Sequence, residues 1–112
     1  MTDLTFLRQF TGNNPEKMKK YINMFVASAP TMVSSMENAL SSGDYETIKI
    51  TAHSLKPQIG YMGISTLEPS IKDIEHYAGE RINLEQLPAM IGSFKSGISE
   101  AISALHSEMN QL

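Results

Sequence analysis

The sequence predicts an all-α protein: an antiparallel up-down-up-down four-helix bundle with a short N-terminal helix. Apolar residues recur every three or four positions through several long segments, as in amphipathic helices. No segment shows the sustained alternation with Val, Ile and aromatic enrichment that is typical of strands. The links between segments are only a few residues long, which favours antiparallel neighbours. At 112 residues the chain can bury one core, so residues 1–112 are expected to form a single domain.

The first half of the chain is expected to form the short helix and one long helix. Asp3 and Gly12 are residue types that open and close a short helix. Asn14 precedes a proline and an acidic residue, as at a helix start, and Gly43 is expected to end the long helix. Pro30 removes one backbone hydrogen bond and is expected to kink it. The apolar positions of the two helices are Leu4, Leu7, Phe10, Met18, Tyr21, Ile22, Phe25, Ala29, Met32, Met36 and Leu40.

The second half is expected to form three more helices. Asp44 can cap the first, and Ser65 and Glu68 have the spacing of a capping box at the second. Gly79 is expected to end the second helix, and the third to begin near Asn83. The apolar positions are Ile48, Ala52, Leu55, Ile59 and Met62, then Leu67, Ile71, Ile74 and Ala78, then Leu87, Ile91, Phe94, Ile98, Ala101 or Ile102, Leu105 and Met109.

The composition argues against several classes of protein. The net charge is -3, from 12 acidic and 9 basic residues, which disfavours broad electrostatic binding of nucleic acid. The basic cluster at Lys17, Lys19 and Lys20 lacks interleaved aromatic residues and is interpreted as a solvated helix face. Without cysteine there are no disulfides or thiolate metal sites. No signal peptide and no apolar run of about eighteen residues is present, so we expect a cytoplasmic protein without membrane insertion.

The most informative segment is residues 52–63, Ala-His-Ser-Leu-Lys-Pro-Gln-Ile-Gly-Tyr-Met-Gly. At about 100° per residue, His53 lies roughly 130° from the centre of the apolar stripe of its helix, so its imidazole is expected to face solvent. Lys56 is one turn further along and neighbours His53 on the helix surface. An exposed imidazole with a cation beside it can hold a transferable phosphoryl group.

Two glycines follow His53 in the same segment. Gly60 and Gly63 are poor helix formers, each costing about 1 kcal/mol relative to alanine. They can keep the surface low beside His53, so that another protein's backbone can approach, or they can fray the helix end. Fraying suits Gly63 and accounts less well for Gly60.

These residues resemble the signature of the histidine phosphotransfer (HPt) domains of two-component phosphorelays, which is His-x-x-Lys-Gly followed by small residues and a later glycine. His53, Leu55, Lys56 and Gly63 match it in type and spacing. The resemblance covers roughly residues 2–80, and the last helix matches only in pattern. The earlier matching residues are Phe25, Ala29, Pro30 and the segment Ala39-Leu40-Ser41-Ser42-Gly43-Asp44.

The segment departs from this signature at two positions. Pro57 stands where glycine is usual; it cannot donate to the His53 carbonyl and its ring crowds that carbonyl, so the helix is expected to bend there. Gln58 stands where serine or alanine is common, and its amide could approach the imidazole or point to water.

The resemblance implies a phosphorelay intermediate. The distal ring nitrogen of His53 would accept a phosphoryl group from a receiver-domain aspartyl-phosphate and pass it to another receiver aspartate, while Lys56 neutralises phosphoryl charge. The segment has no nucleotide loop, no carboxylate cluster for a metal and no general base placed near His53. We therefore expect a phosphocarrier without autonomous kinase activity or a cofactor of its own, with Mg²⁺ on the receiver.

The expected partners are response-regulator receiver domains and a hybrid sensor histidine kinase, and the chain itself is expected to be a monomer. An amphipathic receiver helix would dock around His53. The candidate contacts are Lys49, Pro57, Gln58, Gly60, Tyr61, Gly63 and Ile64. For Tyr61 and Ile64, burial against neighbouring helices is the alternative.

Two other functions are considered. A helical adaptor would bind receiver or kinase domains without carrying phosphate, if Pro57 disturbs the acceptor site. A metal-binding bundle could use Asp73 and His76, which share a helix face, but it would need paired Glu-x-x-His motifs and more inward carboxylates, which are missing. No metal site is expected, and His76 and His106 are interpreted as surface residues.

Overall fold

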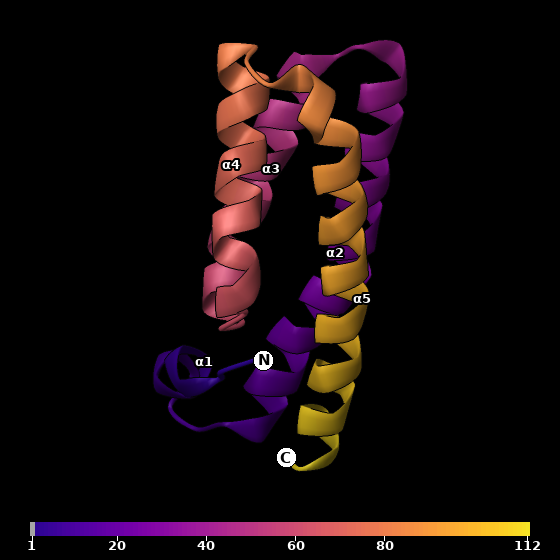
Figure 1. Ribbon diagram of the computed structural model, residues 1–112. Coiled ribbons are helices and arrows are strands. Elements are labelled where there is room, and N and C mark those ends of the chain that lie inside the picture. The colour runs from indigo at the N-terminus through magenta and orange to yellow at the C-terminus, as the bar shows by residue number, and fades with distance from the viewer. Residues whose placement is uncertain (1) are drawn as a thin grey trace.

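The computed structural model describes residues 2–112, and these residues form helices and no strands (Figure 1). The predicted all-α fold class is therefore confirmed. None of the helices in this range is both long enough and apolar enough to cross a membrane. The elements are α1 (Thr5–Thr11), α2 (Pro15–Ser42), α3 (Tyr45–Tyr61), a 3₁₀ turn (Ser65–Leu67), α4 (Glu68–Glu80), a second 3₁₀ turn (Leu84–Gln86) and α5 (Leu87–Asn110).

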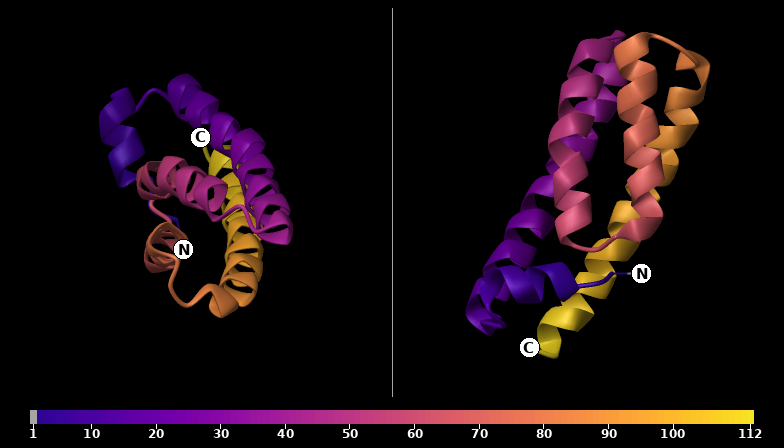
Figure 2. Two further views of the ribbon diagram at one scale, coloured as in Figure 1. Left: turned by 90° about the horizontal axis from the view of Figure 1, so that it is seen from above. Right: turned by 90° about the vertical axis from the view of Figure 1, so that its left-hand side faces the viewer.

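The four longer helices form an antiparallel bundle in which the chain direction alternates from α2 to α5 (Figure 1). α3 packs against α2 and α4, and α5 completes the bundle by contacting α2 and α4. The molecule is elongated, with extents of 42 × 20 × 19 Å. α2 and α5 extend beyond the other two helices at one end, where α1 lies across the bundle (Figure 2).

The predicted turn between α2 and α3 is confirmed, as is the predicted start of α2. The side chain of Asn14 accepts a hydrogen bond from the backbone N–H of Lys17 at 3.1 Å. Gly43 ends α2 in the left-handed conformation at φ +71°, which glycine adopts without steric cost. Asp44 then accepts a hydrogen bond from the N–H of Thr47 at 3.1 Å. The chain therefore reverses direction and starts α3 within two residues.

The predicted start of α4 is wrong, and the short helix begins two residues after Asp3, which still binds its first N–H. The carboxylate of Asp3 accepts a hydrogen bond from the N–H of Thr5 at 2.9 Å, and α1 begins only at Thr5, without a side-chain cap. Ser65 does not form the expected capping box with Glu68. The chain makes a 3₁₀ turn there, and α4 begins at Glu68.

The predicted end of α4 and start of α5 also lie elsewhere. Gly79 is inside α4, which continues to Glu80 and ends with Arg81 in the left-handed conformation at φ +57°. A Cβ on Gly79 would lie 3.1 Å from Cδ of Lys49, so the glycine leaves room for that side chain. Asn83 is left-handed at φ +49°, and α5 starts after the second 3₁₀ turn.

The two internal prolines do not interrupt their helices. α2 continues through Pro30 and α3 continues through Pro57. Each proline removes one N–H from the hydrogen-bond ladder, but both lie on exposed faces, where water can reach the carbonyl that is left without a partner. Pro57 therefore leaves the helix that carries His53 in one piece.

The core holds apolar side chains from all five α-helices, as the predicted stripes require. One prediction fails: Phe10 is 63% exposed, although it was expected on the inner side of the short helix. In α3, Ile48, Ala52, Leu55 and Ile59 are fully buried. Their burial fixes the rotation of α3 about its axis and so determines which of its side chains face outward.

Candidate functional site

His53 lies on the outward face of α3, away from the buried stripe of that helix. Of its side-chain surface, 70% is accessible to solvent. The prediction of an exposed imidazole is confirmed. A reaction partner can reach the ring without any rearrangement of the bundle.

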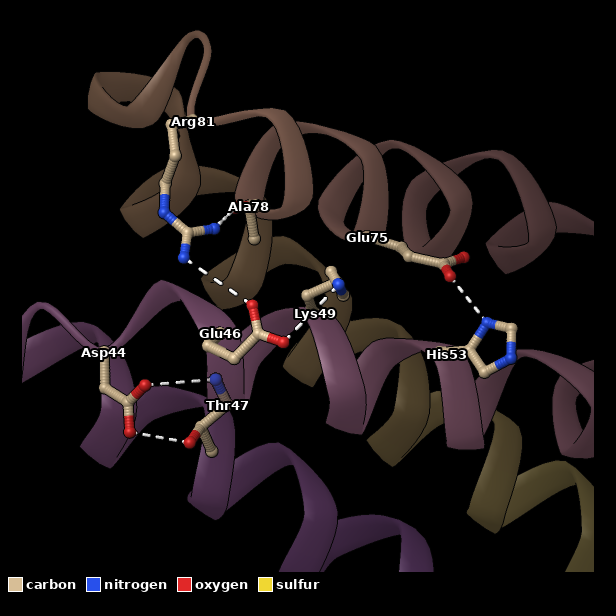
Figure 3. A network of polar contacts seen from close by, with 8 residues as sticks. All are labelled: Asp44, Glu46, Thr47, Lys49, His53, Glu75, Ala78 and Arg81. Carbon is tan, nitrogen blue, oxygen red and sulfur yellow. Dashed lines mark hydrogen bonds and ion pairs between the residues drawn. The ribbon is translucent and has the colours of Figure 1, made fainter.

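Glu75, on the neighbouring helix α4, contacts both His53 and Lys56. Its Oε2 lies 2.6 Å from Nδ1 of His53 (Figure 3), and its Oε1 accepts a hydrogen bond from Nζ of Lys56, also at 2.6 Å. Residues three apart on a helix are neighbours, so one carboxylate can bridge the two side chains. A carboxylate therefore lies beside His53, where no acid-base group was expected from the sequence.

The carboxylate of Glu75 is held in its ionised form. Partial burial would raise the pKa of Glu75, but hydrogen bonds from Lys56 and His53, together with their charges, outweigh burial and lower that pKa. An ionised carboxylate only accepts hydrogen bonds, so Nδ1 of His53 carries the ring proton. In the neutral ring Nε2 then holds the free lone pair, and it points away from Glu75 (Figure 3).

A second group of charges lies before His53 at the start of α3 (Figure 3). Glu46 pairs with Lys49 at 3.4 Å and with Arg81 at 3.7 Å. Arg81 also donates to the carbonyl of Ala78, near the end of α4. Exposed ion pairs are worth about 1 kcal/mol or less, so this group supplements the apolar packing that sets the spacing of α3 and α4.

The Gln58 side chain contacts neither the imidazole of His53 nor only water, which were the two possibilities considered from the sequence. Its amide nitrogen donates to the carbonyl of Ser54 at 3.3 Å, and its Oε1 accepts a hydrogen bond from the hydroxyl of Ser28 on α2, also at 3.3 Å. Gln58 therefore connects α3 to α2 one turn after the histidine and leaves the space around the imidazole open.

The exposed face of α3 differs on the two sides of His53. By helical geometry Lys49 and Lys56 lie on the side toward α4, and Ile50, Pro57 and Tyr61 lie on the other side. We call Lys49, Lys56 and Glu75 the polar flank, and Ile50, Pro57 and Tyr61 the apolar flank.

The apolar flank leads into a groove between α1, α2 and the end of α3. Ile50 and Tyr61 are 54% and 49% exposed. The ring of Tyr61 stacks on Phe6 of α1, with centroids 5.2 Å apart. The groove has a volume of about 640 Å³, and most of its lining is apolar or aromatic. Exposed apolar surface of this kind is typical of a site that another molecule covers.

Ile64 does not belong to this surface, which corrects one of the expected docking contacts, and Gly63 makes a contact within the fold. Ile64 is fully buried, as the alternative for that residue required. Gly63 has φ +62°, its carbonyl accepts a hydrogen bond from the N–H of Asp3 at 3.0 Å, and a Cβ there would collide with the Asp3 carbonyl. Gly63 therefore holds the N-terminal segment against the end of α3. Gly60, in contrast, is exposed and a Cβ there would meet no atom within 4 Å.

The metal-binding alternative finds no donor set in the described part of the chain. Asp73 and His76 are both exposed on α4. Among residues 2–112, no group of three or more His, Asp or Glu side chains lies close enough together to hold a metal ion.

Two residues beside His53, Glu75 and Ile50, were not expected there from the sequence. Glu75 directly follows Ile74 of the buried stripe, so it lies at the edge of that stripe, where a side chain can reach the neighbouring helix. Ile50 is an apolar residue outside the stripe of its own helix. Ile50 departs from the amphipathic pattern in a way that the sequence displays, whereas the contact of Glu75 with His53 depends on how α4 packs against α3.

Together, these features define a class of protein: a helical bundle that presents one accessible histidine, with one ring nitrogen bound to a carboxylate and the other open. The family model for the Hpt domain matches residues 20–112. The chain therefore belongs to the Hpt domain family. Members of this family act in phosphotransfer in two-component signalling, as phosphocarriers rather than kinases, and interact with receiver domains and hybrid kinases.

Two solved structures share the fold. The crystal structure of histidine-containing phosphotransfer protein B (HptB) from Pseudomonas aeruginosa PAO1 has a TM-score of 0.88 and 23% identity, over 99% of this chain and 96% of that one. The HPT domain from the Hpt sensor hybrid histidine kinase from Shewanella has a TM-score of 0.81 and 21% identity, over 98% of this chain and 94% of that one. Among curated protein sequences, none matches this chain significantly.

Proposed function

We propose that this chain is a phosphorelay intermediate that takes a phosphoryl group from the aspartyl-phosphate of one receiver domain onto His53 and passes it to the aspartate of another. The observation that carries this proposal is the accessibility of the ring. The His53 side chain is 70% exposed, Nδ1 is occupied by Glu75, and Nε2 points outward with a free lone pair. That nitrogen is a nucleophile that an incoming receiver can reach.

The polar flank supplies a cation for the transferred group. Lys56 uses one of its three N–H donors on Glu75 and keeps the others for phosphoryl oxygens, and its side chain is 39% exposed. Phosphoryl transfer also needs in-line positioning and further charge neutralisation, usually by a metal ion. We assign Mg²⁺ and the remaining catalytic groups to the receiver domain.

The apolar flank supplies the docking surface for an amphipathic helix of the receiver. It adjoins His53 on the same face of α3, so a helix packed on Pro57 and Tyr61 would bring its own domain to the imidazole. Gly60 keeps the surface low at this point because it has no side chain, and the packing of the bundle does not require a glycine there, since a Cβ would meet no atom within 4 Å. Of the contacts expected from the sequence, Lys49, Pro57, Gln58, Gly60, Tyr61 and Gly63 stay in the proposal, Ile64 leaves it because it is fully buried, and Ile50 joins it.

A non-phosphorylated adaptor is the competing function, and Pro57 was the reason to consider it. α3 continues through Pro57. His53 and Lys56, which precede Pro57 in that helix, both contact the carboxylate of Glu75. The local geometry therefore supports the acceptor role.

The test is transfer of label from a receiver domain charged with radiolabelled acetyl phosphate. We expect acid-labile, alkali-stable label on the wild-type chain and none on His53→Gln. His76→Gln is the matched control, because His76 is an exposed histidine on the neighbouring helix, and it should be labelled like the wild type. Binding of the receiver without labelling of the wild type would refute the proposal and leave the adaptor.

A further inference from the structure

We propose that Glu75 is a positioning residue for phosphotransfer, which keeps the ring proton of His53 on Nδ1 and thereby makes Nε2 the nitrogen that is phosphorylated. This inference rests on the proposed function, and it adds a residue that the His-x-x-Lys pattern does not contain. Glu75 acts through the imidazole and does not itself touch the phosphoryl group.

Glu75 is held firmly between α3 and α4. Only 20% of its side-chain surface is exposed, against 70% for His53. Its second oxygen binds Nζ of Lys56 at 2.6 Å, so the carboxylate cannot rotate away from the ring without losing that charge-assisted bond. The ion pair also favours the ionised form, which can only accept the Nδ1 proton.

No other carboxylate among residues 2–112 contacts His53. Glu46 shares the outward face of α3, but it pairs with Lys49 and Arg81. Asp73 lies on α4 two residues before Glu75, is exposed, and makes no hydrogen bond or ion pair with His53 or Lys56. Glu75 is therefore the carboxylate whose removal should change the imidazole.

The transfer to Nε2 forms one bond to phosphorus and breaks another. The lone pair on Nε2 forms a bond to phosphorus, the bond from phosphorus to the aspartyl oxygen breaks, and its electron pair leaves with the receiver carboxylate. The ring keeps its Nδ1 proton and becomes a cation, which the Glu75 carboxylate stabilises. The onward step reverses these changes at a second aspartate, so neither step needs a proton to move.

Removing the carboxylate should release the ring proton to both nitrogens. In Glu75→Gln the amide can donate to Nδ1 as well as accept from it, so part of the population would carry the proton on Nε2, which then has no free lone pair. Partners that orient a metal-binding histidine through its other ring nitrogen contribute a factor of about 10 to 100, and we take the same factor for Glu75. We expect transfer at saturating receiver to slow by about that factor, with little change in receiver affinity.

Nitrogen-15 NMR of the histidine rings tests the assignment without any receiver. The wild type should show the pattern of a protonated Nδ1 at neutral ring charge, and Glu75→Gln should show averaging toward the other tautomer. Asp73→Asn is the matched control and should keep the wild-type pattern. A wild-type ring protonated on Nε2, or a Glu75→Gln ring that keeps Nδ1 protonated, would overturn the inference.

Chemical phosphorylation separates this inference from the proposed function. Phosphoramidate delivers its phosphoryl group directly to a histidine nitrogen and releases ammonia, so it reports on the ring alone. Glu75→Gln should be labelled about 10 to 100 times more slowly than the wild type and Asp73→Asn at the wild-type rate. Equal rates in all three proteins would overturn the role of Glu75. If the receiver fails to label the wild type, the proposed function fails, and the phosphoramidate rates still decide the role of Glu75.

Discussion

The polar and apolar flanks meet at the same histidine, but the side chains of the polar flank have partners within the protein and those of the apolar flank remain exposed. On the polar flank each side chain has a partner: Lys49 has Glu46, and Lys56 shares Glu75 with the imidazole. On the apolar flank Ile50 and Tyr61 remain about half exposed, and Tyr61 lines an open groove. The difference indicates a division of roles, because a set of paired charges is organised before a partner arrives, whereas exposed apolar surface gains its burial energy only when a partner covers it.

Transfer kinetics with a receiver domain can test this division of roles. Changes on the polar flank should alter the transfer rate at saturating receiver, and changes on the apolar flank should alter the receiver concentration at half-maximal rate. A variant on one flank that changed only the quantity assigned to the other would contradict the division.

The largest expected effect is at Gly63, where the apolar flank is attached to α1. Alanine at Gly63 would need a left-handed backbone and would collide with the Asp3 carbonyl. We expect Gly63→Ala to lower the free energy of unfolding by about 1–3 kcal/mol. The N-terminal segment should move away, and Phe6 should lose its stacking on Tyr61. Urea unfolding measures the loss of stability.

Gly60→Ala is the matched control for that change. Gly60 lies within α3 and has open space where a Cβ would be, so alanine there should stabilise the fold by about 0.5–1 kcal/mol. If both variants unfolded at the same urea concentration, the proposed attachment of the N-terminal segment at Gly63 would be wrong. Phosphoramidate labelling of folded Gly63→Ala should match the wild type, because the polar flank is unchanged.

The next effect in size separates the two flanks directly. Lys56→Met keeps the length of the side chain and removes its charge, so the phosphoryl group loses a cation and Glu75 loses one of its two partners. We expect the transfer rate at saturating receiver to fall about tenfold, equivalent to about 1.4 kcal/mol. Ile50→Lys should leave that rate unchanged and raise the half-maximal receiver concentration several-fold, about 1 kcal/mol, because it places a charge in the docking surface.

Ile82→Lys is the control for Ile50→Lys. Ile82 is also an exposed isoleucine, at 41%, but it lies in the link between α4 and α5. It should change neither kinetic quantity. If Ile82→Lys weakened receiver binding as much as Ile50→Lys, the docking surface would not be the apolar flank.

Features that depend on local sequence could be predicted. The caps at Asn14 and Asp44 and the left-handed turn at Gly43 follow from hydrogen bonds within a few residues, and the structure confirms them. The exposure of His53 followed from helix geometry, because the buried stripe of α3 determines its outward face. These are contacts whose two partners lie close together in the chain.

Features that depend on the packing of distant segments could not be predicted. Gly60 lies inside α3 and Gly63 follows its end, but the close approach of the Asp3 backbone to Gly63 joins segments that are far apart in the chain. Ile64 follows a glycine at the helix end, but the chain folds it fully into the core. The contact between Glu75 and His53 joins residues 22 positions apart, and it needs the register of α4 against α3.

The smallest expected effect is the pH dependence of stability that comes from the polar flank. The pKa of Glu75 is lowered in the folded chain, so the carboxylate stabilises the fold above its ordinary pKa of 4.5 and loses that contribution as the pH falls through the lowered value. We expect the difference in unfolding free energy between the wild type and Glu75→Gln to be about 1 kcal/mol or less at neutral pH and to shrink between about pH 5 and pH 3.

The difference in unfolding free energy between the wild type and Glu75→Gln reports on Glu75 and not on the other acidic residues. The pKa values of Asp3 and Asp44 are also lowered, by hydrogen bonds from Thr5 and Thr47, but both aspartates are present in the two proteins and their contributions cancel. Urea unfolding at a series of pH values measures the difference. A difference that stayed constant into acid would mean that Glu75 gains nothing from its charge. The ionised carboxylate would then be absent from the flank that is proposed to direct the chemistry of His53.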